Sequence, residues 1–254
     1  MIDTHCHLVD PPLRQALPAV LDRARRAGVR ELVVPGTTLS SSVDAIALAE
    51  AHPHVHAAVG IHPEAVTGPI NTETLAALAR HPRVVAIGEI GLDRGPGKPP
   101  RDLQEAAFRD QLRLARDLDL PVLVHSRDAA GAVLRALQDL GPGGPGGILH
   151  AWAGAREVAE QLAPLGMRFG IAGVACRDAA RRVRERLSAL PLPWLVLETD
   201  APYIGTARTP KGRVEPGDLP EIRDALAALQ GVSPSTVAQV TTATARAVLR
   251  LPTP

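Results

Sequence analysis

Residues 84–90 read Val-Val-Ala-Ile-Gly-Glu-Ile, an apolar run with a single carboxylate close to its end. A short run without a polar face is typical of a parallel strand that is covered on both sides. Seven other short apolar runs occur along the chain, at residues 2–5, 32–35, 55–61, 122–125, 148–151, 167–173 and 195–199. Together these runs predict eight parallel strands.

The segments between these runs favour helices. The clearest is 102–118, where Leu103, Ala107 and Leu114 fall at helical spacing, and Asp102 followed by Glu105 is typical of a capping box. Similar segments lie at 41–51, 72–80, 129–140, 156–165 and 178–190. A last helix is expected after Ser233, with this serine as its N-cap and a proline in its first turn.

Eight consecutive strand–helix units in 254 residues match the size of a (β/α)₈ TIM barrel. A doubly wound open sheet is the alternative, but eight units in succession favour closure. No boundary is visible, so residues 1–254 are expected to form one domain. The glycine- and proline-rich segment 141–147 lacks the Lys-Ser/Thr of a phosphate loop and precedes a strand, which predicts a flexible connector.

The composition is that of an ordinary globular protein. The chain is 45% hydrophobic, and 28 basic against 27 acidic residues give a net charge of +1, which excludes a disordered chain. This balance and an aromatic content of 2% argue against a long electrostatic or base-stacking surface for nucleic acid. Two cysteines, no signal-peptide pattern and no apolar stretch of membrane-spanning length favour a cytoplasmic location.

Metal-binding residue types fall at the ends of the predicted strands. His5 and His7 lie two positions apart at the end of the first strand, and side chains so spaced point to one face. The ends of four later strands carry Glu89, His125, His150, and the pair Glu198 and Asp200. Because strand ends meet at one rim of a barrel, a metal site is predicted at the C-terminal rim.

The candidate ligands offer nitrogen and oxygen but no thiolate, a set that suits Zn²⁺, Mn²⁺ or Mg²⁺ without selecting one of them. They are His5, His7, Glu89, His125, His150 and Asp200. Six ligands exceed the need of one tetrahedral zinc but suffice for two divalent ions if Glu89 bridges them. Two such ions can stabilise the attacking and leaving oxygens of a phosphoryl displacement.

Other polar residues are candidates for supporting roles. His62 follows the third strand and is predicted to contact substrate, and Arg127 and Arg213 are candidate phosphate contacts because arginine offers a planar fork of donors. Glu198 is expected to orient a ligand histidine. Three histidines at the opposite end of the barrel are expected in an exposed loop: His52, His54 and His56.

Five motifs together resemble the TatD family of metal-dependent deoxyribonucleases. They are MIDTHCH at 1–7, GIHP at 60–63, GEIGLD at 88–93, HSRDA at 125–129 and LETDAPY at 197–203, and they span nearly the whole chain in the family's order. The resemblance implies a TIM-barrel hydrolase with two metal ions. It implies that one ion is held by His5, His7, Glu89 and Asp200, and the other by Glu89, His125 and His150.

The chain departs from the family pattern at several places. The segment after Asp93 reads Arg-Gly-Pro-Gly, the sixth-strand motif reads His-Ala-Trp where His-Cys-Phe is usual, and the late element 213–216 reads Arg-Val-Glu-Pro without the usual asparagine. No candidate ligand is altered. Because loops set specificity on this fold, these departures are expected to affect substrate preference.

The expected reaction is hydrolysis of a phosphodiester by an exonuclease of this type. A metal-activated water would attack phosphorus, with Asp200 and Glu89 as catalytic residues. DNA ends or short single-stranded DNA are the expected substrates, without a membrane or an obligate protein partner. The alternative is an amidohydrolase that acts on an ester, lactone or amide. Its carboxylated-lysine subclass is disfavoured because neither Lys98 nor Lys211 lies at a strand end.

Overall fold

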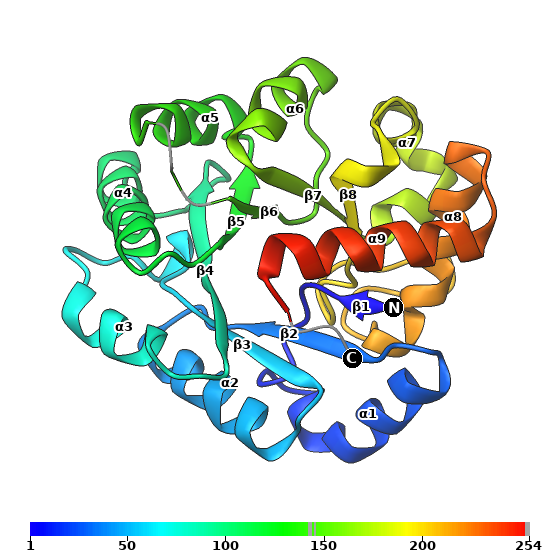
Figure 1. The fold of residues 1–254 in the computed structure, drawn as a ribbon, viewed down its shortest axis with the longest axis horizontal. Coiled ribbons are helices and arrows are strands. Elements are labelled where there is room, and N and C mark those ends of the chain that lie inside the picture. The colour runs from blue at the N-terminus through cyan, green and yellow to red at the C-terminus, as the bar shows by residue number, and fades with distance from the viewer. Residues whose placement is uncertain (142–143, 145, 252–254) are drawn as a thin grey trace.

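The computed structural model describes residues 1–141, 144 and 146–251. Eight parallel strands form one sheet in the order of the chain, from β1 to β8 (Figure 1). The strands are β1 (Ile2–Asp3), β2 (Glu31–Pro35), β3 (Val55–Val59), β4 (Val84–Asp93), β5 (Val122–Arg127), β6 (Gly147–Leu149), β7 (Met167–Ile171) and β8 (Leu195–Leu197).

Backbone hydrogen bonds from the segment after β1 to the last residue of β8 and to the residues that follow it bring the two ends of the sheet together. Thr4 N donates to Leu197 O at 3.0 Å, and Asp200 N donates to His5 O at 2.9 Å. The predicted TIM barrel is thereby confirmed, and the alternative of an open, doubly wound sheet is wrong.

Helices surround the barrel (Figure 1), and seven of them coincide with segments that the sequence predicts as helical, whereas the helices at Leu17–Arg26 and Leu219–Gln230 were not among those segments. The helices are α1 (Leu17–Arg26), α2 (Leu39–Ala51), α3 (Thr72–Ala79), α4 (Arg101–Asp117), α5 (Ala130–Asp139), α6 (Arg156–Leu162), α7 (Arg181–Ser188), α8 (Leu219–Gln230) and α9 (Pro234–Leu249). Within the described ranges, none of these helices combines the length and the apolar character that crossing a membrane requires.

Two predicted helix starts have different outcomes. Ser233 caps α9 as expected, because its hydroxyl accepts from Thr236 N at 3.1 Å. The capping box predicted at Asp102 is wrong: α4 begins one residue earlier, behind Pro100, and no side chain caps it. Pro100 keeps the preceding residue, Pro99, out of the helical conformation, so the helix can begin only after this pair of prolines. The connector expected at 141–147 ends with Gly147 inside β6, and residues 142, 143 and 145 lie outside the described residues.

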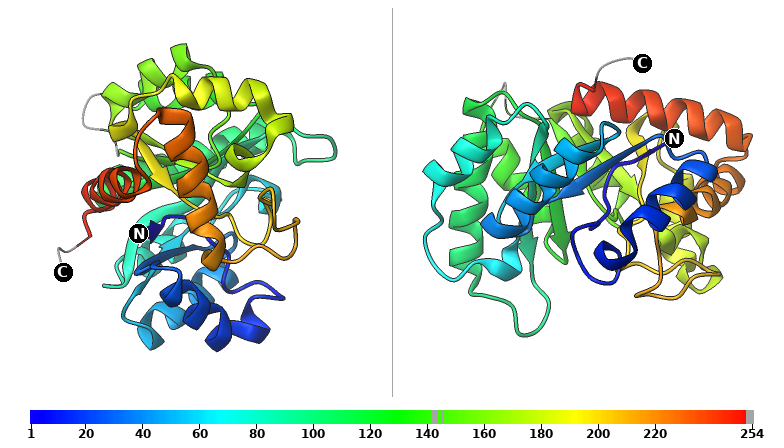
Figure 2. Two further views of the ribbon diagram at one scale, coloured as in Figure 1. Left: turned by 90° about the vertical axis from the view of Figure 1, so that its right-hand side faces the viewer. Right: turned by 90° about the horizontal axis from the view of Figure 1, so that it is seen from below.

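The core has two layers. The larger layer packs the outer faces of the strands against the helices. The smaller layer fills the barrel with one residue from most strands, and α9 covers it with Ala245 and Leu249. In the right-hand view of Figure 2, α9 runs along one edge of the barrel, whereas the loops after β4 and β8 extend from the opposite edge. The strand starts are therefore sealed, and the strand ends are left open for a site.

Ion pairs around Glu31 connect this sealed end to α9. His56 Nε2 lies 3.0 Å from Glu31 Oε2, and Arg246 of α9 binds the other carboxylate oxygen. The expectation that His56 is exposed in a loop is wrong, because β3 begins at Val55 and leaves His56 only 7% exposed. His52 precedes the strand and is partly exposed.

Candidate metal centre

A cavity of about 520 Å³ opens at the end of the barrel where the strands end. Five of the six candidate ligands line it: His7, Glu89, His125, His150 and Asp200. The sixth, His5, is fully buried, with its Nε2 atom 3.2 Å from His7 Nε2. The structure therefore brings together all the residues that the sequence predicts as metal ligands.

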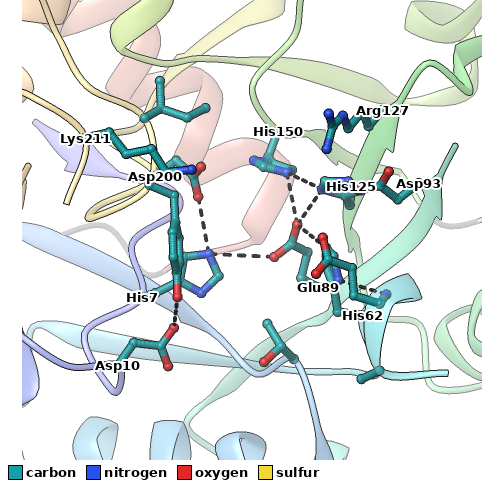
Figure 3. Close-up of a pocket in the computed structure, with 15 residues that line it drawn as sticks. His7, Asp10, His62, Glu89, Asp93, His125, Arg127, His150, Asp200 and Lys211 are labelled. Atoms are coloured by element: carbon teal, nitrogen blue, oxygen red, sulfur yellow. Dashed lines mark hydrogen bonds and ion pairs between the residues drawn. The ribbon is translucent and has the colours of Figure 1, made fainter. Parts of the chain in front are cut away.

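Glu89 lies between two groups of imidazoles (Figure 3). On one side, Glu89 Oε2 is 3.3 Å from His5 Nε2 and 3.7 Å from His7 Nε2. On the other side, Glu89 Oε1 is 3.1 Å from His125 Nδ1 and 3.0 Å from His150 Nε2. The side chain is 2% exposed. Each carboxylate oxygen thus faces a different pair of histidines.

An irregularity in β4 places this carboxylate. The register between β4 and β5 shifts between Ile87 and Ile90, and Glu89 N donates to Gly36 O at 2.7 Å instead of continuing a regular ladder. A bulge of this kind redirects a side chain. The prediction that Glu89 ends its strand is wrong, since β4 continues to Asp93, which pairs with Arg127 of β5.

Asp200, three residues beyond the end of β8, completes the first group. Its Oδ1 atom is 3.2 Å from His7 Nε2 and 3.7 Å from His5 Nε2. Its φ of 49° lies in the left-handed region, which is costly for a residue with a side chain and occurs preferentially at functional sites. Both histidines lie beyond β1, which ends at Asp3, so the prediction that this strand extends to His5 is wrong.

The hydrogen bonds of the ring nitrogens indicate how His125 and His62 can act. His125 Nε2 lies 3.1 Å from Asp93 Oδ2, and its Nδ1 lies 3.1 Å from Glu89 Oε1. A proton on Nε2, donated to Asp93, would leave Nδ1 free to bind a metal ion. His62 caps the short helix η2 (Pro63–Ala65) and accepts from Glu64 N on Nδ1 at 3.1 Å. Its proton is therefore on Nε2, 3.5 Å from Glu89 Oε1. This arrangement suits a donor to substrate better than a metal ligand.

The donor set fits divalent cations. Two pairs of imidazole nitrogens approach each other closely: His5 and His7 Nε2 at 3.2 Å, and His125 Nδ1 and His150 Nε2 at 3.0 Å. Among the described residues, the groups whose ligand atoms all lie within 4.8 Å are His5–His7–Asp200, His5–Glu89–His150 and His62–Glu89–His125. Convergent lone pairs and carboxylates at such spacing are typical of nitrogen–oxygen metal sites.

The electrostatics keep both carboxylates ionised. Burial opposes ionisation, but the imidazoles of His150, His62 and His5 hold the pKa of Glu89 well below its usual value. Burial is likewise outweighed at Asp200, whose pKa is lowered by its hydrogen bond to His7. In return, and against burial, Glu89 raises the pKa of His150 well above its usual value. The cavity therefore presents two ionised carboxylates to an incoming cation.

Glu198 lies behind His150, but too far from the ring to hydrogen-bond to it. It is fully buried, its Oε1 atom accepts from Ala151 N at 2.5 Å, and the same oxygen is 3.7 Å from His150 Nδ1. Gly170 makes room for this carboxylate, because a Cβ atom there would lie 2.0 Å from Glu198 Oε2.

Only some of the predicted substrate contacts line the cavity. His62 and Arg127 line the cavity, whereas Arg213 is exposed and does not line it. Lys211 of the same loop lines it instead and lies across the centre from Arg127 in Figure 3. The sequence analysis did not identify Asp93 as a site residue. The available signal was its carboxylate, which ends the GEIGLD motif four residues after the predicted ligand Glu89.

Comparisons with known proteins agree with this geometry. A family model described as TatD-related DNase matches residues 2–250. The 3'-5' ssDNA/RNA exonuclease TatD of Salmonella typhimurium is 34% identical, with 99% of each chain covered. The uncharacterized metal-dependent hydrolase YabD of Bacillus subtilis is 31% identical, again over 99% of each chain. The crystal structure of YjjV, a TatD homologue from Escherichia coli, matches with a TM-score of 0.94 at 31% identity over 99% of this chain and 98% of that one. The chain is therefore a metal-dependent hydrolase that belongs to the TatD-related DNase family.

Proposed function

We propose that this protein is an exonuclease that removes nucleotides from ends of single-stranded DNA with the help of two divalent ions. His5, His7, Glu89 and Asp200 would hold one ion, and Glu89, His125 and His150 the other. The proposal rests on the position of the Glu89 carboxylate. Its two oxygens face separate pairs of histidines at 3.0–3.7 Å. A carboxylate shared in this way suits a bridging ligand between Mg²⁺, Mn²⁺ or Zn²⁺ ions.

The residues around the centre divide the work of hydrolysis. Divalent ions bound there lower the pKa of water and stabilise charge on phosphate oxygens. Asp200, kept ionised by His7, would accept the proton of the attacking water. His62 would donate from Nε2 to a non-bridging oxygen, and Arg127 would add a forked donor at the cavity wall.

The cavity supports a single strand as substrate. Arg127 and Lys211 lie on opposite sides of the centre (Figure 3), and neither makes an ion pair with a carboxylate in the described part of the chain. Two separated basic side chains can bind consecutive phosphates of one strand. The ssDNA/RNA exonuclease activity in the name of the Salmonella relative agrees with this choice. We regard Arg213 as a more distant contact at the rim of the same loop.

The test is incubation with end-labelled single- and double-stranded DNA and RNA in Mg²⁺, Mn²⁺ and Zn²⁺. We expect stepwise shortening of single strands. Glu89→Gln and His125→Ala should each lower kcat by at least about a thousandfold while circular dichroism stays unchanged. His81→Ala, which removes a partly exposed histidine paired with Glu50 away from the site, is the matched control. Full activity in either site variant would reject the two-ion centre. Hydrolysis of lactones or esters without cleavage of nucleic acid would instead support the amidohydrolase alternative.

Two broader assignments accompany this proposal. We propose that residues 1–254 act as one domain, supported by a sheet whose strand order follows the chain from β1 to β8. We also propose a cytoplasmic location, supported by the two cysteines, Cys6 and Cys176, which are both buried and unpaired as expected in a reducing compartment.

A further inference from the structure

We propose that Tyr203 is the platform on which the nucleobase next to the scissile phosphate stacks. This inference rests on the proposed nuclease function and adds to it the means by which the site selects a nucleotide. Tyr203 lines the cavity and is 44% exposed, whereas the other large apolar side chains exposed among the described residues are Val43 and Val232. An aromatic ring left open at the mouth of a polar cavity is available for a ligand.

The other aromatic residues of the chain serve the core. Phe108 and Phe169 are at most 1% exposed, and Trp152 is 5% exposed. Trp194 packs against the same core and is partly buried. Tyr203 therefore differs from every other aromatic residue of this chain in presenting its ring to the cavity. Burial in the fold does not explain an exposed aromatic residue at this place.

The ring is held in place at two points. Its hydroxyl donates to Asp10 Oδ2 at 2.7 Å, and its ring meets the His7 ring edge to face, with centroids 5.1 Å apart and planes at 74°. The backbone beneath it is fixed as well, since Tyr203 N donates to Asp200 O at 2.6 Å. A platform that is already fixed loses little conformational entropy when a ligand stacks on it.

The ring is also close to the proposed reaction centre. His7 contacts the ring, and Asp200 lies three residues before it in the same turn. A phosphate at the centre would thus bring the base of an adjoining nucleotide within reach of the ring. Ile204, the next residue in the chain, also lines the cavity, and Lys211 lies on the Asp200 side of the centre in Figure 3, available to the next phosphate.

A nucleobase fits this surface better than other groups of the substrate. The sugar and phosphate are polar and find partners among the cations of the cavity, whereas a base has a flat π face that stacks on a tyrosine ring. Stacking accepts any base, because each has such a face. The site would therefore require a base without reading its identity, which suits a nuclease with little sequence preference.

The experiment compares two substrates in four proteins. The substrates are single-stranded oligonucleotides that are identical except that one carries tetrahydrofuran abasic residues in place of its two terminal nucleotides at each end. The proteins are the wild type, Tyr203→Phe, Tyr203→Leu and Tyr203→Ala, all as metal-loaded full-length chains. Phenylalanine keeps the ring and loses the bond to Asp10, whereas leucine keeps apolar bulk beside His7 and loses the flat face. KM and kcat are measured for removal of the terminal residue.

We expect Tyr203→Leu and Tyr203→Ala to raise KM for both strands relative to the wild type, if at all, by different factors. The factor for the normal strand should be roughly ten times the factor for the abasic strand. Tyr203→Phe keeps the ring and should retain most of the wild-type preference for the normal strand over the abasic strand. Equal losses on both strands would overturn the proposal, because they would show that the ring only supports His7. If the wild type cleaves neither strand, the nuclease function itself fails. Metal content and thermal unfolding of each variant separate loss of fold from loss of stacking.

Discussion

Asp93 illustrates how one side chain can set the chemistry of another. It is 1% exposed, its Oδ1 atom accepts from Gly95 N at 2.8 Å, and its Oδ2 atom accepts from His125 Nε2 at 3.1 Å. The backbone bond fixes the carboxylate, and the carboxylate fixes the ring and its tautomer. A histidine that donates to a carboxylate is a more basic ligand through its other nitrogen.

Asp93→Asn should therefore weaken metal binding on the His125 side of the centre. The amide cannot accept from His125 and bond Gly95 N with equal strength, so we expect affinity for one of the two ions to fall by about 10–100-fold. Calorimetric titration with Zn²⁺ or Mn²⁺ resolves the two ions. The control is Glu105→Gln, which removes an exposed carboxylate paired with Arg94 in the same region. Unchanged affinity for both ions would show that Asp93 does not act on the metal through His125.

Metal binding should release protons. Burial opposes protonation of His7 and His150, but the bond to Asp200 and the charge of Glu89 raise their pKa values in the protein without metal. A metal ligand must be the neutral imidazole, so binding displaces these protons. Affinity should accordingly rise as pH rises through the raised pKa values and fall below them. Calorimetry in two buffers of different ionisation enthalpy measures the release, and binding heats that do not depend on the buffer near pH 6 would contradict it.

At the scale of elements, strand identity was predictable and strand length was not. All eight apolar runs form strands, because a parallel strand covered on both faces shows in the sequence. Strand β1 stops at Asp3, whose carboxylate accepts from His5 N at 3.3 Å and from Thr199 N at 3.0 Å. Strand β4 instead continues through a bulge to Asp93. Side-chain bonds across the barrel and a register shift decide these ends, and neither leaves a local pattern.

The packing of β7 against Glu198 gives a prediction at this scale. A Cβ atom at Gly170 would meet Glu198 Oε2 at 2.0 Å, and the carboxylate is fully buried with nowhere to move. Gly170→Ala should therefore destabilise the fold by about 1–3 kcal/mol and weaken metal binding at His150. Thermal unfolding and metal titration measure the two effects.

Gly131→Ala is the matched control for that substitution. Gly131 lies in α5, and the nearest atom to its new Cβ would be Arg135 Nη1 at 3.7 Å. The same change there should be neutral or stabilise by up to about 1 kcal/mol, because alanine favours the helix. If both variants unfold at the same temperature, the close approach of Gly170 to Glu198 has no energetic consequence.

In the whole molecule, the positions of the metal ligands could be predicted from the sequence, whereas those of several residues in loops and at the sealed end of the barrel could not. The ligands could be predicted together, because parallel strand ends of a barrel converge on one rim. Lys211 and Tyr203 could not, because they lie in the loop after β8, whose path is set by long-range bonds such as Gly212 N to Pro202 O at 2.7 Å. His56 was misplaced for a related reason: its partner Glu31 comes from a neighbouring strand, and its third member Arg246 from α9.

The charge of the whole molecule leads to a prediction about salt. With a net charge of +1, binding of a strand should depend on the few cations at the cavity and not on a broad basic surface. If Arg127 and Lys211 each neutralise one phosphate, log(1/KM) for single-stranded DNA should fall against log[KCl] with a slope of about −1.4 at constant Mg²⁺, since each contact contributes about −0.7. Arg127→Ala should reduce the slope by about half. Arg113→Ala, an exposed arginine paired with Asp110, should leave it unchanged. A slope several times steeper in the wild type would reveal a longer track of phosphate contacts and would contradict a grip confined to the cavity.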